Sequence, residues 1–429
     1  LFSSRRRHTR SRSGSRGLGD VYKRQALQFD VTTSRFIVAK TLGTLFGKRV
    51  FYQGPAKTIR LTDIPDPILP APDWVKIQTI CCGFCGSDLN LILLHDSPTA
   101  SPFTSFPCVP GHEIVGRIIE TGTGVDGFTP GDRVVVNPTL NCVTRGIDPV
   151  CRSCRAGRPG NCENFAEGNL PPGMFIGINS GINGGFAPYL VAHQGQLLKV
   201  PEGLSDEAAV MTEPAAVALQ TVFDNMPVKD DHCLVIGGGV IGNLVVQSLR
   251  TLGPDCRIAV IEPAAHAAQL TKEAGANDII EGKTVFDQTA RITGAHVYKP
   301  LLGMEIPIGG FNRIYDTVGI SATLNLSLRL LTAMGTLSVV GIGGNVKLDL
   351  TPLWLKLQTV KGVYAYGSTD YNGQYQPVFN IALDLIAGQT LHTEPLVTHA
   401  FAIENYRKMI EVNLEKSTHK AIKTIVSFK

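Results

Sequence analysis

A glycine-rich turn between a predicted strand and a predicted helix constrains the fold of this chain more than any other feature. The segment CLVIGGGVIG places Gly237, Gly239 and Gly242 in G-x-G-x-x-G spacing, directly after an apolar strand at 232–236. The first two glycines permit a tight turn and the close approach of a pyrophosphate, and the third lets the helix pack on the strand. The phosphates then lie at a helix N-terminus, which favours anions. The pattern predicts a dinucleotide-binding βαβ unit, and a glycine-rich turn in another α/β fold is the alternative.

Glu262 bears on which dinucleotide this unit prefers. It lies 20 residues beyond Gly242, at the end of the next apolar strand, where a carboxylate accepts hydrogen bonds from the adenosine ribose hydroxyls. A carboxylate there repels the 2′-phosphate of NADP, and no arginine follows in residues 263–269. The sequence therefore favours NAD, with NADP as the weaker alternative.

Two sequence textures predict two kinds of domain. From about residue 48, short β-branched runs are separated by Pro and Gly, which indicates a barrel-like β domain. After Pro201, strands and helices alternate, which predicts a parallel sheet with helices on both faces. The expected strands are 232–236, 257–261, 313–316 and 336–340, and the expected helices are 242–252, 265–274 and 321–334. Because β character returns at 360–366 and the chain ends in a helix and a strand at 421–428, we expect the cofactor domain to interrupt the β domain.

The basic charge of the chain comes from its first 25 residues. This Arg/Ser-rich arm carries seven Arg and one Lys against one Asp, and removing its net +7 from the total of +4 leaves −3 for the other 404 residues. The arm reads as a transit peptide, a nucleic-acid arm or non-native read-through, and we expect it to be disordered. The other 404 residues are mildly acidic and therefore do not indicate nucleic-acid binding. A membrane span is not expected either, because no run of about 18 apolar residues is uninterrupted.

Ten cysteines in 429 residues are too few for a disulfide-stapled scaffold. They indicate metal ligands and buried thiols in a reducing compartment, which favours a cytoplasmic location. Four of them lie within 21 residues and end in C-x2-C-x7-C spacing, a pattern that suits a closed, tetrahedral structural zinc site. These four are Cys142, Cys151, Cys154 and Cys162. Loop thiols without a metal are the alternative.

Further motifs carry a family resemblance. Cys85 in GFCGSDLN and His112 in PGHE are not decisive alone, because a single Cys or His is more often structural. In order along residues 50–429, however, the chain presents GFCGSDLN, PGHEIVG, TPGDRVVV, the four cysteines, EPAAVAL, VIGGGVIG and HKAIKTIVSF. In this it resembles the zinc-dependent medium-chain alcohol dehydrogenases, particularly the sorbitol-type polyol and threonine dehydrogenase branches. The resemblance implies a Rossmann doubly wound parallel sheet domain inserted into a GroES-like β-barrel catalytic domain.

The resemblance also divides the chain into segments. It implies a GroES-like domain with the zinc sites, a Rossmann NAD-binding domain and a return to the first domain. Together with the arm, the expected bounds are 1–25, 46–215, 216–343 and 344–429.

A catalytic zinc is the main chemical implication of the resemblance. Its ligands would be Cys85, His112 and Glu213, with a Glu where the ethanol-type branch has a Cys. Three protein ligands leave a fourth position for water or substrate, where an alcohol oxygen loses its proton more easily. Hydride then passes to the nicotinamide. For Glu213, an acid that merely favours the start of a helix before Pro214 is the alternative.

Other residues match supporting roles in the family. Glu113 resembles an acid that can approach the metal, and Asp88 resembles the residue that orients the ligand histidine. Solvated loop acids are the alternative for both. Ser87 matches the hydroxyl that takes the substrate proton. Lys423 aligns with a basic residue that reaches the cofactor pyrophosphate, and a surface lysine on an edge strand is the alternative. The remaining expected cofactor contacts are Val240, Ile241, Val318, Val340, Gly341 and Ile342.

The chain departs from the family pattern at two motifs. Asn90 stands where the family has a relay His, and because Asn cannot titrate we expect a flatter pH–rate profile near neutrality. A single ionisation near the histidine value that is lost on mutating Asn90 would contradict this. In the four-cysteine segment, eight residues (VTRGIDPV) separate Cys142 from Cys151 where the family has two. The stretch 284–308 is also longer than the family suggests.

The function predicted from the sequence is hydride transfer between NAD and a secondary alcohol, polyol or hydroxy amino acid. A zinc-free NADPH-dependent reductase and a non-catalytic cofactor-binding protein of the same fold are the alternatives. The resemblance implies a homodimer or homotetramer acting on a small molecule. Fold-level analogy does not choose among alcohols.

Overall fold

A computed structural model describes residues 25–341 and 343–429, with the side chain of Lys283 excepted. The expectations for residues 1–24 and for Ile342 lie outside the described residues. The disorder expected for residues 1–25 is wrong for Gln25, which is the first residue of strand β1 (Gln25–Phe29).

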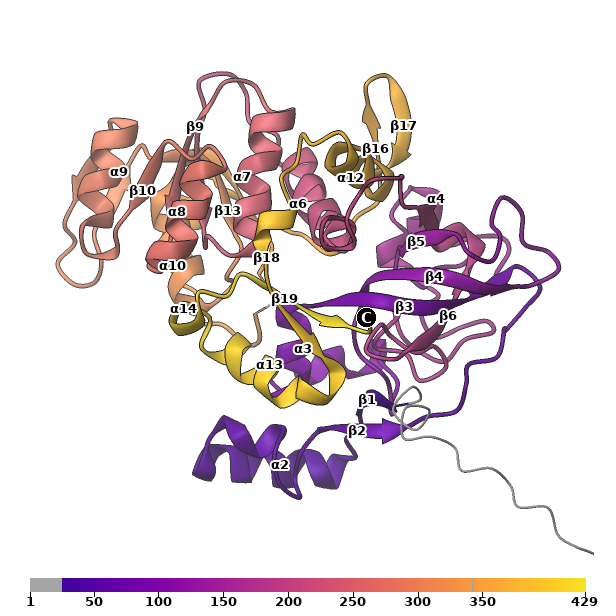
Figure 1. Cartoon of the computed structure of the whole chain (residues 1–429). Coiled ribbons are helices and arrows are strands. Elements are labelled where there is room, and N and C mark those ends of the chain that lie inside the picture. Colours follow the sequence, from indigo (N-terminus) through magenta and orange to yellow (C-terminus); the bar gives the residue numbers. More distant parts are fainter. Residues whose placement is uncertain (1–24, 342) are drawn as a thin grey trace, which may run out of the picture.

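A six-stranded parallel sheet forms one half of the molecule (Figure 1). Its strand order is β10-β9-β8-β13-β14-β15. Numbered along the chain this is 3-2-1-4-5-6, the order of doubly wound dinucleotide-binding sheets, whose ligands bind where the order reverses. The predicted doubly wound parallel sheet is therefore confirmed. The strands are β8 (His232–Ile236), β9 (Arg257–Ile261), β10 (Asp278–Ile280), β13 (Phe311–Asp316), β14 (Leu331–Val339) and β15 (Thr359–Gly362).

Helices cover both faces of this sheet. Along β8, Cys233 and Val235 join the core formed with helices α6, α7 and α12, whereas Leu234 and Ile236 join the core beneath α9 and α10. A strand that is buried on both faces must be apolar at every position, which explains the continuous run CLVI. The helices are α6 (Thr212–Asp224), α7 (Val240–Leu252), α8 (Ala265–Glu273), α9 (Val285–Thr293), α10 (Ser321–Leu330) and α12 (Val378–Ala387).

The boundary expected at residue 343 is wrong for one strand. Residues 359–362 form β15, which pairs in parallel with β14 as the sixth strand of the cofactor sheet. The return to β character near residue 360 is therefore still part of this sheet. The helix expected at 321–334 also ends at Leu330, and β14 begins directly after it.

A second, mostly antiparallel sheet forms the other half. Its order is β18-β19-β3-β4-β5-β7, with β6 also on β3. The C-terminal strand β19 lies against β3, so segments from opposite ends of the sequence share one sheet (Figure 1). The strands are β3 (Trp74–Phe84), β4 (Glu113–Thr121), β5 (Arg133–Val136), β6 (Tyr189–His193), β7 (Leu197–Lys199), β18 (Val397–Ala402) and β19 (Lys423–Ser427).

Smaller elements surround these two sheets. Strand β1 pairs with β2 (Ile59–Asp63), and helix α2 (Thr33–Phe46) follows β1. The long stretch 284–308 folds as α9 and a hairpin of β11 (His296–Tyr298) and β12 (Ile306–Ile308). The remaining helices and strands are α3 (Gly86–Ile92), α4 (Arg152–Arg155), α5 (Asp206–Ala209), α11 (Thr351–Leu355), α13 (Tyr406–Leu414), α14 (Lys416–His419), β16 (Ser368–Tyr371) and β17 (Gln374–Pro377). The 3-10 turns are η1 (Lys48–Phe51), η2 (Pro98–Phe103), η3 (Pro159–Asn161), η4 (Gln194–Gln196), η5 (Gly282–Thr284), η6 (Glu394–Leu396) and η7 (Ile403–Asn405).

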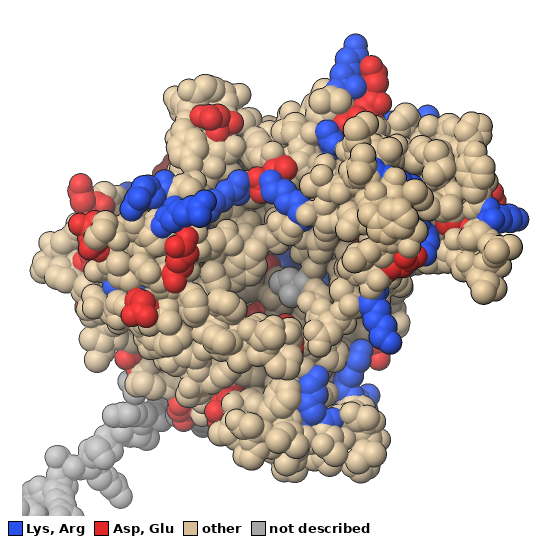
Figure 2. Space-filling model, turned by 180° about the vertical axis from the view of Figure 1, so that it is seen from behind, with Lys and Arg blue, Asp and Glu red and all other residues tan. Residues whose placement is uncertain are grey.

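The surface mixes charges of both signs. On the face shown in Figure 2, Lys and Arg side chains are interspersed with Asp and Glu, and the face is hollowed near its centre. Within the part of the chain that the structure describes, no helix combines the length and apolar character needed to cross a bilayer.

Candidate active site

The pairing of β3 with β4 brings the two predicted zinc-binding motifs together. Cys85 directly follows β3 and caps the N-terminus of α3, and His112 directly precedes β4. Because the two strands are antiparallel, with Gly83 opposite Glu113, the end of one lies beside the start of the other. Ligand atoms of Cys85, His112 and Glu113 lie within 4.8 Å of one another. A thiol, an imidazole and a carboxylate form a donor set that suits zinc.

Asp88 holds both motifs in place. Its carboxylate accepts a hydrogen bond of 2.9 Å from the backbone N–H of Cys85 and lies 3.7 Å from Nδ1 of His112. Burial raises the pKa of Asp88, and the neighbouring His112 opposes that rise. Burial alone would lower the pKa of His112, but Asp88 and Cys85 raise it well above its usual value. The position of Asp88 therefore fits the orienting role that the resemblance implied.

Glu113 and Lys423 form a buried ion pair beside this cluster. Nζ of Lys423 donates to both carboxylate oxygens of Glu113 at 2.6 Å, and both side chains are at most 4% exposed. A side chain at Gly83 would overlap the Glu113 carboxylate, so this position needs a glycine. The alternative of a surface lysine on an edge strand is wrong, because β19 lies between β18 and β3. The expected contact of Lys423 with a pyrophosphate is not supported either, because its ammonium is enclosed against Glu113.

Glu213 lies near the cluster but outside its closest group. It is the second residue of α6, is 7% exposed and interacts electrostatically with His112, Glu113 and Lys423. Burial raises the pKa of its carboxyl to about 7. Among the described residues, no hydrogen bond is made to this carboxylate. The expected third ligand is thus a buried acid that accepts no hydrogen bond among the described residues and interacts electrostatically with His112.

Two aromatic residues that sequence reasoning missed lie in a row beside His112. The ring of Phe175 lies edge-on to the ring of His112, with centroids 6.5 Å apart, and Tyr364 lies edge-on to Phe175 at 5.5 Å. Burial and the charge of Glu213 raise the pKa of Tyr364. Both residues come from irregular segments without a motif, so no spacing could have revealed them. They form an aromatic wall beside the candidate metal site.

Ser87 and Asn90 lie in the first and second turns of α3, the helix that begins at Cys85. Both side chains are half-buried. The predicted effect of Asn90 on the pH–rate profile stays a prediction.

The four-cysteine lobe converges despite its lengthened first gap. All four sulfurs lie within 4.8 Å of one another, with Cys162 Sγ 3.6 Å from Cys142 Sγ and 4.0 Å from Cys151 Sγ. Although burial alone would raise it, backbone N–H groups of Cys154 and Glu163 lower the pKa of Cys151 to about 6. Four converging thiols, with N–H groups that favour the thiolate form, fit a tetrahedral structural zinc site.

Arg145 explains how the eight-residue insertion is accommodated. Its side chain is fully buried, and its guanidinium donates to backbone carbonyls of Glu167, Leu170, Pro171 and Gly173. Burial lowers the pKa of Arg145, and the thiol groups of Cys162 and Cys142 oppose that effect. The insertion therefore supplies a guanidinium group that stabilises the lobe by binding the backbone carbonyls of its neighbouring loop.

Replacing Arg145 by methionine should destabilise the protein by about 3 kcal/mol, because several buried carbonyls lose their donor at once. Zinc that is loaded into the lobe should also leave faster when a chelator is added. Urea unfolding and zinc release measure the two effects. Arg155→Met is the matched control, because Arg155 belongs to the same lobe but is exposed. Equal losses in the two variants would contradict this role for Arg145.

The glycine-rich turn lies at the point where the order of the parallel sheet reverses. Gly237 has a φ of +94°, and a side chain at Gly242 would overlap the carbonyl of Gly237. Helix α7 then begins at Val240 and includes Ile241, with Gly239 as its N-cap. The Glu262 carboxylate accepts hydrogen bonds of 2.7 Å from the backbone N–H groups of Gly238 and Ala264.

Asp316, which sequence reasoning missed, organises the other side of this site. At the end of β13, its side chain accepts from the backbone N–H of Val318, and its carbonyl accepts from those of Val340 and Gly341. A side chain at Gly237 would meet Val318. The cofactor contacts expected after β8, β13 and β14 therefore lie close together. In sheets of this strand order, a dinucleotide binds at the carboxyl edge, where these residues lie.

Comparison with known proteins identifies both halves of the chain. Residues 71–202 match the family model for the alcohol dehydrogenase GroES-like domain, and residues 240–382 match that for zinc-binding dehydrogenase. The (R,R)-butanediol dehydrogenase of Bacillus subtilis is 28% identical over 359 residues, which cover 81% of this chain and 91% of the relative. The L-threonine 3-dehydrogenase of Francisella philomiragia is 26% identical over 348 residues, which cover 80% of this chain and 90% of the relative.

A solved structure shares the fold. A putative zinc-binding dehydrogenase from Sinorhizobium meliloti 1021, bound to NADP, superposes with a TM-score of 0.66. It is 25% identical, and the alignment covers 86% of this chain and 95% of that one.

Proposed function

The chain belongs to the zinc-dependent medium-chain alcohol dehydrogenase family, and we propose that it oxidises a secondary alcohol or polyol with NAD at the centre around Cys85 and His112. It is an oxidoreductase that transfers hydride between an alcohol and a nicotinamide cofactor. One observation carries the site assignment: Cys85, His112 and Glu113 approach within 4.8 Å, with the buried Glu213 nearby. The zinc-free reductase and the non-catalytic protein are disfavoured, because the residues for both metal sites are present.

Cys85, His112 and Glu213 are the zinc ligands that we propose for this centre. Lys423 already donates to both oxygens of Glu113, whereas the buried Glu213 carboxylate has no such donor among the described residues. A buried acid without a partner is costly, and a metal ion removes that cost. The four cysteines of the lobe are the proposed ligands of a structural zinc.

The protein's own residues supply orientation and proton transfer. When bound, zinc would favour ionisation of the alcohol oxygen and the nicotinamide would accept hydride. Asp88 orients the imidazole of His112 through Nδ1, which leaves Nε2 for the metal. Ser87, two residues after Cys85, is the proposed proton relay: its hydroxyl would accept the substrate proton and pass its own proton on to water. Phe175 and Tyr364 would exclude water from one side of the substrate.

The substrate class that we propose is a secondary alcohol carrying a second polar group. The two curated relatives are named for butanediol and for the 3-position of L-threonine. A screen of 2,3-butanediol, sorbitol, L-threonine and 2-butanol with NAD, followed by absorbance of the reduced cofactor, tests this proposal. Turnover of a diol, polyol or hydroxy amino acid above 2-butanol is expected. No turnover of any of them would contradict it.

The proposed preference for NAD rests on Glu262, and replacing this residue by glutamine tests it. The variant should lose about tenfold or more in kcat/KM for NAD, because charged acceptors bind hydroxyls more strongly than neutral ones. Its kcat/KM for NADP should not fall, because a like-charge repulsion is removed. Glu273→Gln is the control, since Glu273 is an exposed acid on the next helix. An unchanged NAD-to-NADP ratio in Glu262→Gln would contradict the proposal.

A homodimer or homotetramer is the proposed assembly. All four residues of the edge strand β15 are exposed, and Trp354 and Leu357 beside it are 65% and 73% exposed. An open edge with apolar neighbours is suited to pairing with a second copy. Sedimentation of a monomer at micromolar concentration would contradict this.

The cysteines are all free, which supports a reducing compartment such as the cytoplasm.

A further inference from the structure

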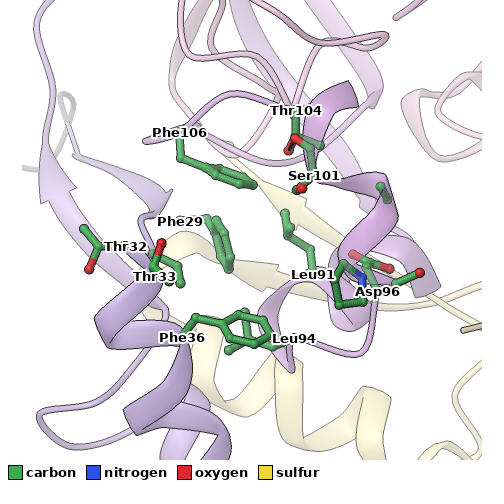
Figure 3. A pocket seen from close by; sticks show the side chains of 14 residues that line it. Phe29, Thr32, Thr33, Phe36, Leu91, Leu94, Asp96, Ser101, Thr104 and Phe106 are labelled. Atoms are coloured by element: carbon green, nitrogen blue, oxygen red, sulfur yellow. Dashed lines mark hydrogen bonds between the residues drawn. The ribbon is translucent and has the colours of Figure 1, made fainter.

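A cavity of about 440 Å³ is lined by none of the candidate zinc ligands. It is lined by the end of β1 and the segment that follows it, by the C-terminal end of α3 and by the turn η2 (Figure 3). Its wall is largely apolar, and it includes Phe29, Phe36, Leu91, Leu94 and Phe106. Neither the metal chemistry nor the dinucleotide site uses this cavity.

Three phenylalanine rings, those of Phe29, Phe36 and Phe106, line the cavity. The rings of Phe29 and Phe106 meet at 5.1 Å between centroids, and Figure 3 shows them along one side of the cavity. Nζ of Lys40 lies 6.0 Å from the centroid of the Phe36 ring, so this ring already interacts with a cation. The negative faces of aromatic rings attract cations in this way.

A single acidic side chain lies on the opposite side, beside Leu91 (Figure 3). Asp96 is half-buried, and within the described part of the chain its carboxylate makes no hydrogen bond and no ion pair. Burial raises its pKa to about 6; Asp88 adds to the rise and Lys40 opposes it. A partly buried carboxylate against apolar walls is unfavourable unless a partner compensates it.

The backbone that presents this acid is itself unusual. Leu94 has a φ of +55°, in the left-handed region, at the end of α3. This conformation is costly for a leucine and persists only where the surroundings impose it. The Leu94 side chain is buried in the cavity wall, and Asp96, two residues further along this turn, also lines the cavity.

We propose that this cavity is a binding site for an organic ammonium ion carried on a small apolar body. The ammonium group pairs with Asp96, and the phenylalanine rings hold the apolar body and the outer face of the positive charge. The site is independent of the zinc chemistry, so it stands or falls separately from the proposed dehydrogenase activity.

Calorimetric titration with 2-phenylethylammonium tests the site, with phenylacetamide as a neutral compound of similar shape. The amine should bind about tenfold or more tightly than the amide, because charged hydrogen bonds and cation–π contacts add to apolar burial. Asp96→Asn should abolish this difference. Asp126→Asn, which removes an exposed acid elsewhere, should leave it intact.

Two further variants locate the binding. Ala100→Trp fills the cavity and should abolish binding of the amine, whereas Cys85→Ser should leave it unchanged. Equal binding of amine and amide, or an unchanged dissociation constant in Asp96→Asn or Ala100→Trp, would overturn the proposal. Loss of amine binding in Cys85→Ser would also overturn it, because the amine would then occupy the metal centre. Thermal unfolding of each variant shows that a loss of binding does not come from misfolding.

Discussion

Replacing Lys423 by methionine is expected to destabilise the protein by about 3–5 kcal/mol, because it leaves a buried charge without its partner. Glu113 is 1% exposed, and its two carboxylate oxygens both accept from Lys423 Nζ at 2.6 Å. The methionine variant keeps the volume of the side chain but removes the cation. The free energy of unfolding in urea measures the effect.

Two controls make this prediction specific. Lys429→Met removes a lysine whose side chain is 52% exposed, and it should cost less than about 1 kcal/mol. The double variant Glu113→Gln with Lys423→Met should recover much of the loss, because no uncompensated charge then remains. A double variant as unstable as the single one would contradict the account.

The same pair predicts a pH dependence. Burial alone lowers the pKa of Lys423, but the charges of Glu113 and Cys85 outweigh it and raise the pKa above its usual value. The stabilisation is therefore fully present below about pH 10.4, the ordinary lysine value, and is lost as the pH rises through the higher folded value. The Lys423 ammonium therefore remains charged throughout the neutral range.

Cys85→Ser is expected to lower kcat/KM for the alcohol by about a thousandfold or more. A catalytic zinc contributes several kcal/mol of charge stabilisation, and each 1.36 kcal/mol is a factor of ten in rate. NAD binding, measured by fluorescence quenching, should change little, because the cofactor turn lies on the other sheet.

Cys81→Ala is the matched control for this loss of activity. Cys81 is a buried thiol in β3 that belongs to neither cysteine cluster. If both variants lose activity equally, the effect comes from the fold and not from a metal ligand.

The sequence predicted the parallel sheet well, because each of its central strands is marked by a local run of apolar residues. The strands 232–236 and 257–261 have the bounds that the apolar runs indicated. By contrast, the strand near residue 360 was assigned to the wrong domain. This strand is short and its residues are exposed, so only its pairing with β14 shows that it belongs to the parallel sheet. Such pairing over a long sequence separation leaves no local pattern.

The candidate site was predictable where a family motif marks it. Cys85, His112 and Asp88 come from neighbouring motifs, and strand pairing brings them together. Lys423 was misjudged, because its contact with Glu113 crosses 310 residues of sequence. Asp316, Phe175 and Tyr364 were missed, because their roles depend on how loops from distant segments converge.

The most direct test of the zinc-based mechanism is the number of zinc ions bound per chain in Cys85→Ser and in the unmodified protein, both purified without chelators. We expect two ions in the unmodified protein and one in the variant, because only the four-cysteine lobe remains complete. Two ions in the variant would contradict the assignment of Cys85, and no zinc in the unmodified protein would contradict the zinc-dependent mechanism itself.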